Sequence, residues 1–177
     1  MSNEVRMEYM TQDEVGVAID QERLVILPTG ATEAHGPHMP TDTDTHQAGH
    51  IAMLLAKNIG AVVAPTINYG ISKTFEHFPG TISLSIPLYQ ELVYEVGSAL
   101  IKSGFKKVLI LNGNRPNGTA NDAVAYDATE TNDFMLFEEA FPVDFVPAFF
   151  AVFKLCKYPV SVPAFTISFR CVATPSL

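Results

Sequence analysis

Apolar residues in the first 118 positions alternate between short unbroken runs and stripes of helical spacing. The runs lie at residues 24–27, 61–65 and 107–111, the last of which is apolar after Lys107, and they are typical of strands buried on both faces. The stripes predict helices at residues 11–21, 44–58 and 87–103. Strands that alternate with helices predict an α/β fold, here a layered αβα domain with a mainly parallel sheet and right-handed crossovers.

Local signals place the ends of these helices. Thr11 and Glu14 have the spacing of a capping box, which predicts a helix start. Gly60 and Gly104 follow the second and third helices and are expected to stop them. The second helix would bury Ala48, Ile51, Ala52, Leu55 and Ala56, and the third would bury Leu88, Leu92, Val96 and Leu100.

The character of the chain changes after Gly118. All 11 glycines lie at or before this position, and most of the 12 phenylalanines lie after it. Four prolines cut the later region into pieces too short to span a bilayer as one helix: Pro142, Pro147, Pro159 and Pro163. We expect residues 1–118 to form the α/β domain. Residues 119–177 form an atypical Phe- and Pro-rich region, a diverged or altered continuation of that domain that the pattern does not assign.

Composition excludes several classes of protein. With 47% hydrophobic and 17% charged residues, the 177-residue chain has enough apolar material for a folded core. Its formal net charge of −8 argues against nucleic acid or an anionic membrane surface as a partner. The first ten residues lack an apolar leader, and there are two cysteines, Cys156 and Cys171. We therefore expect a cytoplasmic protein without a structural disulfide.

Residues 33–44 concentrate the candidate chemistry. Within these twelve positions lie the carboxylates Glu33, Asp42 and Asp44 and the imidazoles His35 and His38. Glycine and proline interrupt the segment, so it is neither a regular helix nor a central strand. The segment follows a predicted strand, and ligands in open α/β sheets bind beyond the carboxyl ends of strands. Carboxylate and imidazole ligands suit zinc, manganese or iron, so the sequence predicts a divalent metal site.

Three blocks of the chain resemble the creatininase family of metal-dependent amidohydrolases. They are residues 27–45, 78–84 and 108–113. The resemblance implies a creatininase-like fold, a homo-oligomer, and hydrolysis of a non-peptide carbon–nitrogen bond in a small or cyclic amide. It also implies that Glu33 and His35 bind different ions of a two-metal site and that Asp44 bridges both.

The chain departs from the family pattern in the third block. Asn114 stands where the family has a metal-binding histidine, and Arg115 places a positive charge beside it. A later catalytic histidine of the family has no counterpart, since no histidine follows His77. We therefore expect weak or single-metal binding, and the sequence names no general acid or base. The alternative is a catalytically impaired pseudoenzyme or truncated family member with a structural or oligomerisation role only.

The remaining candidates have weaker support. His38 and Asn114 are candidates to orient the metal ligands from a second layer. His46 and His50 lie four positions apart on a predicted helix, where an ordinary exposed helix face is the favoured interpretation. A phosphate-binding domain is a weaker third possibility because no glycine-rich phosphate loop follows a predicted strand.

Overall fold

Within the described part of the chain, four parallel strands form a central sheet. The computed structural model describes residues 4–131 and 135–140. The sheet has the order β2-β1-β3-β4, from Val62–Val63, Val25–Thr29, Lys107–Asn112 and Met135–Ala140. The register places Thr29 opposite Asn112, so β1 and β3 end side by side at the same edge.

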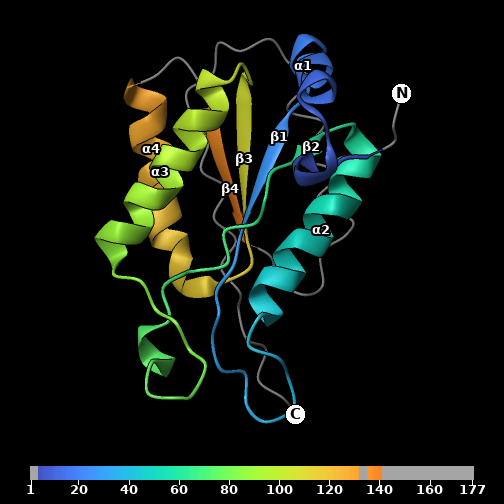
Figure 1. Ribbon diagram of the computed structural model, residues 1–177. Helices are drawn as coiled ribbons and strands as arrows, with labels where there is room; N and C mark the ends of the chain where they lie inside the picture. Colours follow the sequence, from blue (N-terminus) through green and yellow to red (C-terminus); the bar gives the residue numbers. More distant parts are fainter. Residues whose placement is uncertain (1–3, 132–134, 141–177) are drawn as a thin grey trace, which may run out of the picture.

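Helices cover both faces of this sheet, which confirms the predicted α/β fold. The α-helices are α1 (Gln12–Asp20), α2 (Thr43–Ile59), α3 (Ile86–Lys102) and α4 (Gly118–Thr131). Short 3-10 helices also occur among the described residues: η1 (Met7–Tyr9), η2 (Lys73–Phe75) and η3 (Arg115–Asn117). Helix α2 lies on one face, while α3 and α4 pack side by side on the other (Figure 1). None of the described helices combines the length and apolarity needed to cross a bilayer.

Alternation along the strands divides the core into two halves. Val25 and Leu27 of β1 face the half that includes residues of α1, α3 and α4. Ile26, between them, faces the half that is built largely from α2. Each of these three side chains is fully buried, as the unbroken apolar run predicts for a strand covered on both faces.

Two of the predicted helices agree closely with the structure. Thr11 caps α1, and its hydroxyl accepts from the Glu14 backbone while the Glu14 carboxylate accepts from the Thr11 backbone. The buried residues of α2 include Ala48, Ala52, Leu55 and Ala56 from the predicted stripe, and Ile51 packs partly buried beside them.

The buried face of α3 was predicted in the wrong place at its start. Leu88 is 56% exposed, whereas Tyr89 and Val93 are fully buried. Leu92 and Val96 pack at the margin of the core. The tyrosine is selected because its ring fills the core while its hydroxyl donates a hydrogen bond to Asn121. A search for apolar residues at helical spacing favours leucine over tyrosine, so it selects Leu88 and does not find the buried face that contains Tyr89.

Helix α4 and strand β4 continue the layered fold beyond Gly118. Helix α4 contacts α3 and β4, and Ala120, Val124 and Ala128 are buried in the core. The hydrophobic pattern assigned no element here, because its buried positions are mostly alanine. Whether a structural boundary falls at Gly118 stays a prediction. Cys156, Cys171 and the four prolines from 142 to 163 lie outside the described residues.

Candidate metal centre

The three predicted ligands lie at the carboxyl edge of the sheet. Glu33 and His35 belong to the loop that joins β1 to α2, and Asp44 is the second residue of α2. This is the edge at which ligands bind in open α/β sheets. The position was expected from the order of the predicted strand, loop and helix.

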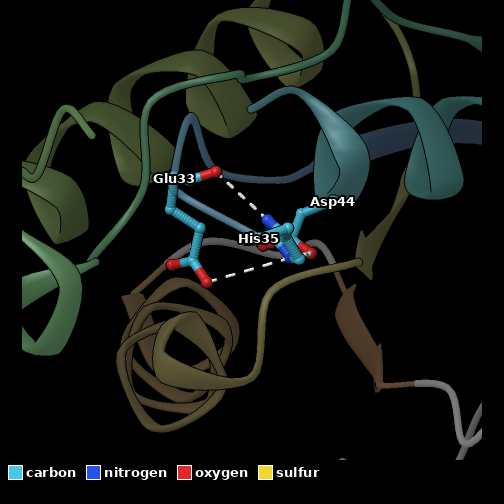
Figure 2. A group of neighbouring side chains, drawn as sticks. All are labelled: Glu33, His35 and Asp44. Atoms are coloured by element: carbon cyan, nitrogen blue, oxygen red, sulfur yellow. Dashed lines mark hydrogen bonds and ion pairs between the residues drawn. The ribbon is translucent and has the colours of Figure 1, made fainter. Parts of the chain in front are cut away.

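The three side chains point toward one another (Figure 2). Nε2 of His35 lies 3.1 Å from Oδ1 of Asp44 and 3.9 Å from Oε1 of Glu33. One potential ligand atom from each residue falls within 4.8 Å of the other two. This is the only such group of three histidine, cysteine or carboxylate side chains among residues 4–131 and 135–140.

Burial makes this group electrostatically costly without a cation. Glu33 is only 6% exposed and Asp44 only 8%. Oε2 of Glu33 is buried and has no hydrogen-bond partner among the described residues. Burial raises the pKa of the Asp44 carboxyl above its ordinary value; neighbouring His35 opposes the rise, and Glu33 adds to it. Two buried carboxylates and one imidazole therefore suit a divalent cation.

A backbone contact orients His35. Its Nδ1 lies 3.1 Å from the carbonyl oxygen of Glu33. When Nδ1 carries the proton and donates to that carbonyl, the lone pair of Nε2 faces Asp44. Histidines that bind metals are commonly oriented in this way by a carbonyl on their other nitrogen.

Contacts with neighbouring segments fix the position of the loop between β1 and α2. The backbone N–H of Glu33 donates to the carbonyl of Thr41, and that of Ala34 donates to Oγ1 of Thr81. Thr81 lies in the second of the three blocks, so the first two blocks are in contact. On the far side, a Cβ added at Gly113 would stand 2.4 Å from the backbone oxygen of Asp44. Only glycine lets the loop after β3 approach Asp44 so closely.

Asn114 is committed to a different set of contacts. It is 2% exposed, and its side-chain nitrogen donates to the carbonyl of Ile71 and to Oδ1 of Asn117. Asn117 also accepts from the backbone N–H of Ile71 and donates to the carbonyl of Gly30. The structure thus places the Asn114 amide in a buried network that joins three loops. Its role in orienting metal ligands stays a prediction.

The other sequence candidates do not join the three ligands. His38, His46 and His50 are exposed, as is Asp42. No hydrogen bond among the described residues links His38 to Glu33, His35 or Asp44. The sequence analysis did not predict the rest of the buried polar network. In it, Thr29 donates to Asn112, Asn121 donates to Thr29, and Tyr89 donates to Asn121. The spacing of Asn117 and Asn121, one helical turn apart, was the available signal.

Comparison with known proteins assigns the chain to a family. The family model described as creatinine amidohydrolase matches residues 8–160. A mycofactocin precursor peptide peptidase of Mycolicibacterium smegmatis is 38% identical over 100 residues, covering 53% of this chain and 40% of the relative. A 3-dehydro-scyllo-inosose hydrolase of Thermotoga maritima is 32% identical over 112 residues, covering 62% and 36%. The creatinine amidohydrolase of Pseudomonas putida is 31% identical over 99 residues, covering 53% and 38%.

Solved structures agree with these matches. A crystal structure of creatinine amidohydrolase superposes with a TM-score of 0.73 at 26% identity, covering 92% of this chain and 66% of the solved chain. A manganese form of creatininase gives a TM-score of 0.72 at 26% identity, covering 86% and 63%. The chain spans 36–40% of the length of the three curated relatives. By the extent of the family match and the shared fold, the chain belongs to the creatininase family.

Proposed function

We propose that this chain is a metal-dependent amidohydrolase that cleaves a non-peptide carbon–nitrogen bond in a small or cyclic amide. The observation that carries the proposal is the group of two buried carboxylates, Glu33 and Asp44, and half-buried His35, whose candidate ligand atoms lie within 4.8 Å of one another. Oε2 of Glu33 has no hydrogen-bond partner among the described residues, and a bound cation would satisfy it. Relatives named as a manganese creatininase and a zinc–zinc creatininase support a divalent ion.

Each of the three residues would supply one kind of ligand atom to that ion. Glu33 and Asp44 supply carboxylate oxygens, and His35 supplies the nitrogen that its backbone contact leaves free. A divalent ion bound there would polarise an amide carbonyl and lower the pKa of a water molecule. The low exposure of both carboxylates keeps bulk water away, which strengthens electrostatic interactions within the site. Zinc, manganese and iron all accept this set of ligands.

We infer that the site binds metal weakly or holds a single ion, in place of a normal two-metal centre. Asn114 stands where the family has a further metal-binding histidine, and its nitrogen is engaged by Ile71 and Asn117. A neutral amide oxygen is a poorer zinc ligand than imidazole. Metal analysis of the dialysed protein should therefore find at most about one equivalent of ion at the buried site.

Zinc titration combined with an assay for creatinine hydrolysis tests the proposed function. Wild type should bind zinc tightly and release product, while Asp44→Asn should lose both properties. Creatinine and a formamide serve as substrates because the proposed reaction requires a carbon–nitrogen bond to a carbonyl. Tight binding without hydrolysis of either substrate would instead favour the rival function, a scaffold without catalysis. Absence of zinc binding in the folded wild type would remove the metal site itself.

We also propose that the protein forms homo-oligomers. Six large apolar side chains between β2 and the start of α3 are 37–56% exposed: Tyr69, Phe75, Phe78, Ile82, Ile86 and Leu88. We name residues 69–88, which end in the first turn of α3, the apolar loop; the part before α3 lies below that helix in the view of Figure 1. Exposed apolar side chains gathered in one segment favour contact with another protein surface. A second copy of the chain is the partner that the proposal commits to.

A further inference from the structure

Helix α2 carries two histidines outside the buried ligand group. His46 and His50 are exposed and one turn apart, and their rings lie nearly parallel, with centroids 6.3 Å apart and 17° between their planes. Side chains four positions apart on a helix lie on the same face. Both rings border an open depression of about 450 Å³ that Met39 and Gln47 also line.

We infer that His46 and His50 form a second, surface site for a transition-metal ion. Two imidazoles on one face can chelate a single ion at about 2.0–2.1 Å from each nitrogen. Because both side chains are exposed, modest rotations about their torsions can bring their nitrogens to one point. The site is separate from the buried carboxylates Glu33 and Asp44 and from half-buried His35, and the inference does not depend on the proposed function.

The ligands indicate which ions this site prefers. Both histidines are neutral nitrogen ligands, and no carboxylate among the described residues joins them in a group of three. Imidazole suits copper, nickel and zinc, and affinity rises from nickel to copper and falls again at zinc. The site should therefore take Cu²⁺ in preference to Ni²⁺ or Zn²⁺, and calcium or magnesium should not compete.

Retention of the full, tag-free chain on immobilised Cu²⁺ tests the inference. A resin-bound ion reaches an exposed histidine pair but not the buried ligand group. Wild type and Asp44→Asn should be retained equally, whereas His46→Ala and His50→Ala should elute early. In solution, each of these two changes, made in the Asp44→Asn background so that the buried group does not take the ion, should weaken Cu²⁺ binding by on the order of a hundredfold, because a single imidazole lacks the chelate. His77→Ala, which removes another exposed histidine, serves as the matched control and should bind like wild type.

A spacing rescue gives the test its specificity. Leu54 lies one turn after His50 and is 51% exposed, so His46→Ala/Leu54→His rebuilds a pair with the same separation. This variant should regain retention and tight Cu²⁺ binding. Retention of His46→Ala and His50→Ala at the wild-type level, or failure of the rescue variant to bind, would overturn the inference.

Discussion

His35 and Asp44 lie nine positions apart, and Nε2 of the histidine is 3.1 Å from Oδ1 of the aspartate. The loop after β1 turns back so that the first turn of α2 faces it. This contact, with Glu33 beside it, leaves two carboxylates and one imidazole in a largely buried space. Burying two carboxylates without a cation costs free energy, which gives the first prediction.

Glu33→Gln and Asp44→Asn should separate the stability of the metal-free protein from its response to metal. Removing one buried carboxylate relieves repulsion, so each variant should gain about 1 kcal/mol of unfolding free energy in the presence of a chelator. Wild type should gain about 2.7 kcal/mol when zinc is present at 100 times its Kd, and the variants should gain little. Urea denaturation with chelator and with zinc measures both effects. A zinc response in Asp44→Asn equal to that of wild type would contradict the assignment.

Asn114→His should lower the stability of the fold and raise its affinity for metal. Imidazole cannot reproduce both hydrogen bonds that the amide nitrogen donates to Ile71 and Asn117. We expect the change to lower the free energy of unfolding by about 2 kcal/mol while raising zinc affinity or stoichiometry. Asn114→Leu is the matched control, since it removes the same hydrogen bonds without adding a ligand.

The two Asn114 variants also distinguish the competing functions. Higher zinc affinity without hydrolysis of creatinine would show that the limiting loss lies elsewhere in the chain. Equal zinc affinity in Asn114→His and Asn114→Leu would show that position 114 does not face the ion. Calorimetric titration and the hydrolysis assay together give these results.

Gly113→Ala should displace Asp44, because the added methyl group would clash with the backbone of Asp44. The added Cβ would stand 2.4 Å from the Asp44 backbone oxygen and 3.0 Å from Cβ of Ala48, so the first turn of α2 must shift. We expect a loss of about 2 kcal/mol in stability together with weaker zinc binding. Gly16→Ala is the control, because nothing lies within 4 Å of its added Cβ and helix α1 should gain about 0.5–1 kcal/mol. Unchanged zinc affinity in Gly113→Ala would show that the loop after β3 does not position Asp44.

Charged substitutions in the apolar loop should weaken self-association. Phe78 and Ile82 are 47% and 46% exposed, so Phe78→Asp/Ile82→Asp should leave the fold intact while placing charges in the proposed contact. Light scattering during size-exclusion chromatography should show a smaller assembly than wild type. Tyr126→Asp changes another exposed aromatic residue, 63% exposed on α4, and should not alter the assembly. A monomeric wild type would contradict the homo-oligomer proposal.

The sequence by itself determined the layers of the fold and the segment that contains the candidate metal ligands. Unbroken apolar runs such as 24–27 are readable because both faces of a parallel strand are buried, and the capping box at Thr11 is readable because it is a local hydrogen-bond pattern. The segment from Glu33 to Asp44 was identified because glycine and proline excluded a packing explanation for its polar residues.

Tertiary structure alone decided which polar groups meet. Asn114 donates to the carbonyl of Ile71, 43 positions away, and Asn121 donates to Thr29, 92 positions away. No local pattern encodes such contacts, because they depend on where two strands end in the sheet. The buried face of α3 was decided in the same way, since Tyr89 is buried through a partner on another helix. The convergence of the three candidate ligands was likewise fixed by the fold of the loop, which the sequence could only place beside one strand end.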